Sequence, residues 1–286
     1  MPRGIPVFWG NRKWVQEKDG TIRPAEPVNA DHPNWSDYSN LTISESVHTA
    51  GHPLLSYRQQ LHKQIIEGAL ASIERYHSQN PACILTHGGI ASGKTAAIER
   101  FLSAKGLNQE YFHIDFDKMK KELPEYKYMQ EQKIRLAASF VQSESAKLAG
   151  TLLKKAIGQN ANVIYEGSLC QLETIEQRIR QMRRRNYRIS VISTHVSEEK
   201  GQHRAITRFE QGGRYVPPEA VSGTYKKCPG TLVALKTLVD DIFLIDNNED
   251  APSKLILMIS DGVVEEIDKE LYNSYLGLVG NGGSLL

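Results

Sequence analysis

The 286-residue sequence predicts an α/β fold in which a parallel β-sheet is covered by helices on both faces. Short apolar runs alternate with longer segments whose apolar residues recur at helical spacing. Several of these runs end directly at polar groups, among them a glycine-rich loop, Asp115, Glu166 and Asp246. Because ligands of such sheets bind beyond the carboxyl ends of the strands, we expect a functional site at that edge of the sheet.

The expected elements follow one another in the order that such a sheet requires. Apolar residues from Leu61 to Ile73 form a helical stripe within residues 56–77. The pair Asp261-Gly262 is typical of a hairpin turn near the end of the chain. The remaining expectations are strands at 82–86, 111–114, 162–165, 188–192 and 242–245, helices at 130–156, 172–185 and 197–210, two short helices before 242, and the hairpin at 254–266.

The domain organisation is predicted to be an N-terminal arm followed by one large domain. Residues 1–56 are rich in Pro, Asn, Asp, His and Trp and show no sustained periodicity. We expect an irregular arm that packs on the body of the protein, because its tryptophans are costly to expose. A small hairpin is expected within it around Asp19-Gly20. Residues 57–286 are long enough to form the single α/β domain.

Composition favours a protein that acts in the cytoplasm. The formal net charge of +2 argues for neither a membrane surface nor a nucleic acid as partner. No apolar run approaches the length of a membrane span, and the N-terminus lacks the apolar core of a secretion signal. Delivery into another cell by a route without such a signal stays open. Cys83, Cys170 and Cys228 are odd in number and widely spaced, so we expect free thiols.

The glycine-rich loop has the sequence GGIASGKT, from Gly88 to Thr95. It matches G-x-x-x-x-G-K-[ST] between an expected strand and an expected helix, the setting of a P-loop that binds a nucleoside triphosphate. The glycines let the backbone turn its N–H groups around an anion, and the helix that follows presents its N-terminal donors to phosphate. Lys94 would reach the β- and γ-phosphates, and the Thr95 hydroxyl would bind Mg²⁺. The residues expected to bind ATP are Gly88, Gly89, Ala91, Ser92, Gly93, Lys94 and Thr95.

Acidic residues after two later strands are candidates for the chemistry of phosphoryl transfer. A kinase needs a carboxylate that accepts the proton of the acceptor hydroxyl, and Asp117 or Asp115 is suited to this role. One of the two is expected to cap the next helix, and we favour Asp117 as the base. Glu166 is expected to bind a substrate hydroxyl or to support Mg²⁺, unless it forms an ion pair with a neighbouring arginine. Ser168 is a weaker candidate for a substrate contact.

Two groups of arginines call for different interpretations. Arg208 and Arg214 flank Gly212-Gly213 and indicate a mobile lid that stabilises the charge of the moving phosphoryl group. The basic run at 178–188 would suit a polynucleotide groove, but no aromatic residues accompany it in the pattern of such grooves. We interpret this run as the solvated end of a helix, so that nucleic acid is an unlikely partner.

Taken together, these residues resemble the zeta toxin family of P-loop kinases over about residues 57–250. The matching segments, in order, are GGIASGKT, Ile114-Asp115-Phe116-Asp117 with Leu123-Pro124-Glu125-Tyr126, Tyr165-Glu166-Gly167-Ser168, and Arg208-Phe209-Glu210 with Gly213-Arg214. The resemblance implies a P-loop kinase fold with an arginine-bearing lid over residues 57–286. It also implies an ATP- and Mg²⁺-dependent kinase that phosphorylates UDP-N-acetylglucosamine and is held by an antitoxin.

The same resemblance implies roles for single residues. Asp117 would be the general base, Lys94, Arg208 and Arg214 would clamp the phosphates, and Asp115, Glu166 and Ser168 would line the substrate side. The chain departs from the family pattern at Ile90 and Ala91, where Pro and Gly are usual, and at Ser168, where Thr is common.

Three functions follow as alternatives. The first is a kinase of a small nucleotide-like metabolite, such as UDP-N-acetylglucosamine. The second is a kinase that acts on NAD-type dinucleotides or polynucleotide ends. The third is a nucleotide-dependent switch that acts through a partner, although no Asp-x-x-Gly element of the GTPase kind is present.

Overall fold

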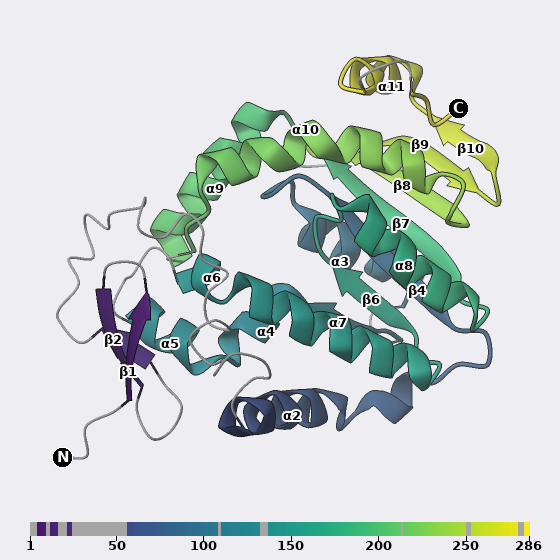
Figure 1. Ribbon diagram of the computed structural model, residues 1–286. Helices are drawn as coiled ribbons and strands as arrows, with labels where there is room; N and C mark the ends of the chain where they lie inside the picture. The colour runs from purple at the N-terminus through teal and green to yellow at the C-terminus, as the bar shows by residue number, and fades with distance from the viewer. Residues whose placement is uncertain are drawn as a thin grey trace. The chain divides into compact units, whose positions relative to one another are not determined.

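The computed structural model describes residues 5–9, 12–16, 22–24, 56–107, 110–131, 137–212, 214–249, 253–279 and 283–286 (Figure 1). The chain divides into two compact units. The first consists of Met1–Ala71, Asp115–Leu152 and Thr207–Val216, and the second of Ser72–Ile114, Leu153–Ile206 and Pro217–Leu286.

The second unit is built on a seven-stranded sheet with the strand order β10-β9-β8-β7-β4-β6-β5. Strand β4 pairs in parallel with β6 and β7, and β7 pairs in parallel with β8. The antiparallel strands β9 and β10 extend the sheet as the predicted hairpin. The bounds are β4 Ala82–Gly88, β5 Phe112–Asp115, β6 Val163–Glu166, β7 Arg188–His195, β8 Asp241–Asp246, β9 Lys254–Ser260 and β10 Val263–Ile267.

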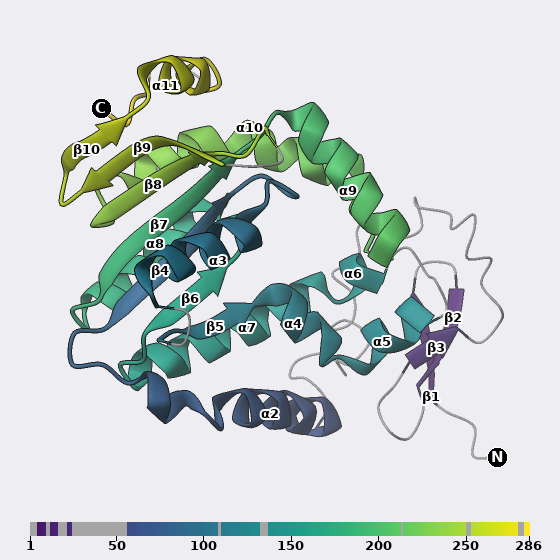
Figure 2. The same ribbon diagram turned by 180° about the vertical axis from the view of Figure 1, so that it is seen from behind.

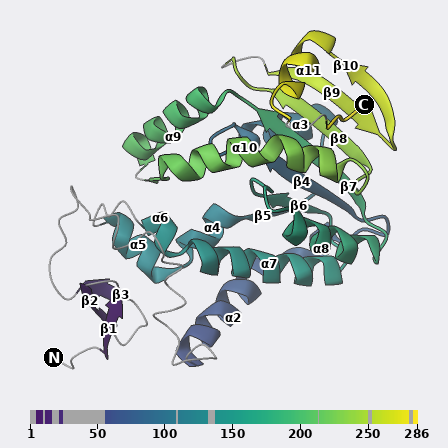
Figure 3. The same cartoon turned by 45° about the horizontal axis from the view of Figure 1, so that its top comes forward.

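Helices cover both faces of this sheet, as Figures 1 and 2 show from opposite sides. Helix α3 (Lys94–Lys105) packs its apolar side on one face, because Ala97, Ile98 and Leu102 form a buried cluster with isoleucines of β4, β6 and β7. Alternate strand residues point the other way. That opposite face is covered by α8 (Leu172–Arg183) and α10 (Pro218–Leu235), and Figure 3 shows α10 lying over the sheet.

Two helices of the second unit differ from expectation. The two short helices expected before residue 242 are the single helix α10, which continues through Pro229. Its buried residues, among them Leu232 and Leu235, pack on the sheet, so tertiary burial outweighs the cost of an internal proline. Helix α11 (Lys269–Leu276) was not predicted, and its N-terminus is capped by the side chain of Asp268.

The first unit contains helices in place of the long helix that was expected at 130–156. That prediction was wrong, because the segment divides among three helices. Residues from Ala137 to Val141, ahead of the last one, include several that are fully buried. No glycine or proline marks this break, so packing decides it and periodicity cannot show it. The helices are α2 Ser56–Leu70, α4 Phe116–Lys121, α5 Pro124–Glu131, α6 Ala137–Phe140 and α7 Gln142–Gly158. Helix α7 begins in the first unit and ends in the second, whereas α9 (Glu198–Gly212) begins in the second unit and ends in the first.

The N-terminal segment forms a small antiparallel sheet of β1 (Ile5–Trp9), β2 (Arg12–Gln16) and β3 (Ile22–Pro24). Gln16 pairs with Ile22, so β2 and β3 are the two strands of the predicted hairpin. Its turn at Asp19-Gly20 lies outside the described residues. Strand β3 lies next to α5 of the same unit. The boundary at residue 56 stays a prediction.

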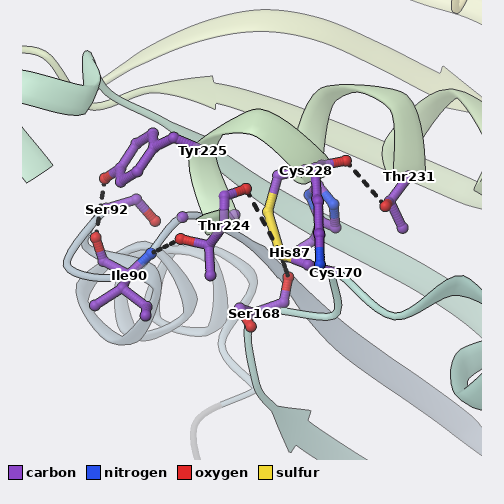
Figure 4. Close-up of a disulfide and its surroundings, with 12 residues drawn as sticks. His87, Ile90, Ser92, Ser168, Cys170, Thr224, Tyr225, Cys228 and Thr231 are labelled. Carbon is purple, nitrogen blue, oxygen red and sulfur yellow. Dashed lines mark hydrogen bonds between the residues drawn. A yellow bond between two sulfur atoms is a disulfide. The ribbon is translucent and has the colours of Figure 1, made fainter. Parts of the chain in front are cut away.

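The expectation of three free thiols was wrong for two of them. Cys170 and Cys228 form a disulfide, with their Cα atoms 5.2 Å apart, as Figure 4 shows. They are 58 residues apart in sequence and meet because α10 returns to the segment that follows β6. Cys83 is free and buried. Among the described residues, no helix has the length and apolar character of a membrane span.

Candidate active site

The phosphate-binding loop of the second unit joins β4 to α3. Gly88 and Gly93 adopt left-handed φ angles of 132° and 87°. A Cβ atom on Gly88 would lie 2.4 Å from the Thr194 carbonyl oxygen, so the loop requires glycine there. No side chain caps the N-terminus of α3 at Gly93. The first N–H groups of the helix and the positive end of its dipole are therefore available to an anion, and the loop has the form that a triphosphate needs.

Contacts from neighbouring segments fix this loop. The Ser92 hydroxyl lies 2.6 Å from that of Thr194, and the Asn247 amide donates to the Ser92 carbonyl at 2.9 Å. The Lys94 ammonium group donates to the carbonyl oxygens of Gly89 at 2.7 Å and of Gly88 at 3.2 Å. A phosphate would offer this ammonium group stronger, charge-assisted acceptors than two neutral carbonyls.

Thr95, Glu166 and His113 form a hydrogen-bonded chain beside the loop. The Thr95 hydroxyl donates to Glu166 Oε1, and His113 Nε2 lies 2.8 Å from Glu166 Oε2. Burial alone would raise the pKa of Glu166, but the contacts with His113 and Thr95 and the charge of Lys94 outweigh it and lower that pKa. An ionised carboxylate next to a hydroxyl supplies the oxygen ligands that Mg²⁺ prefers, so the residues present fit this ion.

Asp117 of the first unit is held between two cations. Arg214 Nη1 contacts its Oδ2, and the Lys120 ammonium group lies 3.1 Å from its Oδ1. The expected capping role belongs to Asp115, whose Oδ1 accepts the Asp117 N–H at 2.7 Å at the start of α4. The side chain of Asp117 is therefore not occupied in capping the helix.

Lys120 and Arg208 add buried positive charge to the first unit. Lys120 is only 2% exposed, and burial, assisted by the charge of Arg208 and opposed by that of Asp115, lowers its pKa to about 8. Burial also lowers the pKa of Arg208. Its Nε and Nη2 atoms are buried and have no hydrogen-bond partner within the described part of the chain, and the same is true of Arg214 Nε. Buried guanidinium donors of this kind are suited to bind an anion.

Comparison with known proteins identifies the family. A family model described as "Zeta toxin" matches residues 66–252, which include the loop, Asp117, Glu166, Arg208 and Arg214. The chain belongs to the zeta toxin family. The resemblance drawn from the motifs is thus confirmed, and the chain is a phosphotransferase of the P-loop kinase type.

Solved structures share the zeta toxin fold of this chain. The AvrRxo1-ORF1:AvrRxo1-ORF2 complex with sulphate ions has a TM-score of 0.63 at 18% identity and covers 83% of this chain and 81% of its own. The AvrRxo1-ORF1:-ORF2 structure with ATP has a TM-score of 0.61 at 15% identity, with 81% and 76% covered. The PezAT toxin–antitoxin system of Streptococcus pneumoniae has a TM-score of 0.58 at 16% identity, with 77% and 92% covered. No curated protein matches the chain.

The residues that the sequence predicted for this zeta toxin family site are divided between the two units. The second unit holds the phosphate loop, Glu166 and Ser168, whose carbonyl accepts the Gly88 N–H at 3.3 Å. The first holds Asp115, Asp117, Arg208 and Arg214. Helix α9 ends at Gly212, two residues beyond the predicted end at residue 210, and Gly213 of the predicted lid lies outside the described residues.

Sequence reasoning missed His113 and Lys120. The alternation of strand β5 offers a signal for His113, because a period of two places it on the same face as Asp115. Among the described residues, Glu166 pairs with His113 and with no arginine, so the arginine partner that was considered as an alternative is not found there. Two arginines of the basic run are engaged in ion pairs, Arg183 with Asp240 at 2.8 Å and Arg188 with Asp241 at 2.6 Å.

Proposed function

We propose that this kinase transfers the γ-phosphoryl group of ATP to a hydroxyl of a small nucleotide-like metabolite, UDP-N-acetylglucosamine or a related compound. The observation that carries the proposal is the environment of Asp117, whose carboxylate contacts Arg214 and Lys120. In the same unit, two buried nitrogen atoms of Arg208 have no hydrogen-bond partner among the described residues. A carboxylate that accepts a proton and arginines that bind a phosphoryl group are the two requirements of this reaction.

In the proposed reaction each residue has one task. The acceptor oxygen forms a bond to the γ-phosphorus while the bond to the β–γ bridging oxygen breaks and ADP leaves. Asp117 accepts the hydroxyl proton, and Arg208 and Arg214 stabilise the charge on the moving group. Lys94 and the loop N–H groups hold the β- and γ-phosphates. Thr95 would hold Mg²⁺, which neutralises phosphate charge.

Three residues are assigned to the acceptor side of the site. Glu166, with Asp115 and Ser168, is assigned to the substrate hydroxyls, in keeping with the low pKa of Glu166 and its oxygen atoms. A kinase of NAD-type dinucleotides or of polynucleotide ends is the alternative. The engagement of Arg183 and Arg188 in ion pairs disfavours the polynucleotide. A nucleotide switch would need neither a base nor paired arginines.

We also propose that the protein is a toxin held by an antitoxin and acts in the cytoplasm, where ATP is available. The support is membership of the zeta toxin family and the description of PezAT as a toxin–antitoxin system.

A transfer assay tests the proposed function. The protein and its Lys94→Ala variant are incubated with γ-labelled ATP and a panel of UDP-sugars, dinucleotides and oligonucleotides. We expect label on a UDP-sugar with the wild type only. Label on a dinucleotide or an oligonucleotide selects the alternative kinase, and ATP binding without any transfer selects the switch.

A further inference from the structure

Ala91, in the phosphate loop, adopts a backbone conformation that is unfavourable for its residue type. Its φ angle is 62°, in the left-handed region where the Cβ atom of an L-residue meets its own backbone. Such a conformation persists only where surrounding contacts determine it. The neighbouring residue Ile90 makes two contacts of this kind.

Two consecutive residues of α10 hold both polar groups of Ile90 (Figure 4). The Ile90 N–H donates to Thr224 Oγ1 at 3.0 Å, and the Ile90 carbonyl accepts from the Tyr225 hydroxyl at 2.9 Å. The Thr224 hydroxyl donates its own hydrogen to the Val221 carbonyl at 2.7 Å. Its oxygen is thus left to accept from Ile90, and the direction of each bond is fixed.

The Tyr225 ring is itself fixed between two glycines. A Cβ atom on Gly89 would lie 2.5 Å from the ring, and one on Gly201 would lie 2.2 Å from its hydroxyl oxygen. Burial raises the pKa of Tyr225, so its hydroxyl keeps the hydrogen that it donates. One turn further along α10, the disulfide from Cys228 to Cys170 ties the helix to the segment that follows β6.

The Tyr225 contact bears on the anion site because it holds the peptide between Ile90 and Ala91, and the Thr224 contact holds the peptide before it. If the peptide between Ile90 and Ala91 turned over, its carbonyl oxygen would leave Tyr225 and could face the phosphates that the loop N–H groups are meant to bind. A carbonyl oxygen that points toward an anion repels it and opposes binding. When Tyr225 holds the carbonyl, only the N–H groups of the loop face the anion.

We propose that Thr224 and Tyr225 are positioning residues of the phosphate loop, which fix the two peptide groups on either side of Ile90 so that Ala91 stays in its left-handed conformation and the loop is preformed for triphosphate. The inference rests on the proposed function, because it takes ATP to be the ligand of the loop. It adds residues of α10, more than 120 positions after the loop in sequence, to the nucleotide site.

Mg·ATP binding to the full-length chain, measured by titration calorimetry, tests the inference. Tyr225→Phe keeps the ring and removes one net hydrogen bond, so we expect ATP to bind about five- to tenfold more weakly. Thr224→Val should have an effect of the same size. Thr224→Ser keeps the hydroxyl and should bind ATP as the wild type does.

Tyr187→Phe is the matched control. The Tyr187 hydroxyl also donates to a buried carbonyl, that of Ala161 at 2.8 Å, but at the amino end of β7. It should lower thermal stability about as much as Tyr225→Phe and leave ATP affinity unchanged. The inference is overturned if Tyr225→Phe and Thr224→Val bind ATP as tightly as the control. If the wild type and Lys94→Ala bind ATP equally, the proposed nucleotide function itself fails, which is a separate result.

Discussion

Asp117 lies between two cations, Lys120 and Arg214. Its position after an apolar run marks it as a candidate base, and the segment that follows it contains three lysines that look alike in the sequence. Of Lys118, Lys120 and Lys121, only Lys120 is buried, and only its ammonium group reaches Asp117. A short helix gives no reliable periodicity, so the distinction depends on packing. The second cation, Arg214, lies almost a hundred positions away in sequence.

The pH dependence of transfer should report on Lys120. Below a pH of about 8 its amine is protonated and donates to Asp117, and above that pH the charge is lost. We therefore predict that kcat/KM falls as the pH rises through about 8. Arginine stays charged throughout this range, so Lys120→Arg should shift the alkaline fall to higher pH.

Lys121→Arg, on the same helix but exposed, is the control and should leave the profile unchanged. A Lys120→Arg profile that coincides with that of the wild type would show that another group causes the fall.

At the scale of elements, buried charge joins helices of the first unit. Arg58 on α2 is fully buried and donates to Glu125 of α5 at 2.8 Å and to Glu144 of α7 at 2.6 Å. The helical stripe of α2 was predictable from its apolar residues. The ion cluster was not, since an arginine and two distant glutamates read as surface residues in a sequence. The same holds for the disulfide, which depends on the path of α10.

Removing Arg58 should destabilise the protein strongly. Arg58→Met removes the guanidinium group that the two buried carboxylates share and leaves the charge of Glu125 and Glu144 poorly compensated, so we predict a loss of about 3–5 kcal/mol in the free energy of unfolding. Denaturant titration measures this loss. Lys63→Met is the control, because its ion pair with Glu67 on the same helix is exposed and should contribute about 0.5 kcal/mol or less. Equal effects of the two variants would show that the buried cluster does not hold the helices.

At the scale of the whole molecule, the sequence was most informative where a local rule fixes the structure. Alternating apolar runs predicted the parallel strands, Asp261-Gly262 predicted the hairpin, and glycine spacing predicted the phosphate loop. Prediction failed where distant packing decides, as in the broken helix before α7 and the single helix α10. The candidate site follows the same rule. Local spacing predicts its motif residues, and the alternation of β5 offers a signal for His113, whereas Lys120 and Tyr225 are known only through their contacts.

The central claim is that ATP binding and proton transfer are performed by different residues of this kinase. The most direct test compares Asp117→Asn with the wild type, in ATP affinity and in transfer to the acceptor that the panel identifies. We predict that transfer falls by about 10²–10⁴-fold, the usual contribution of a general base, while ATP affinity stays close to that of the wild type. Transfer at the wild-type rate, or a collapse of ATP binding in this variant, would contradict the assignment of Asp117 as the base.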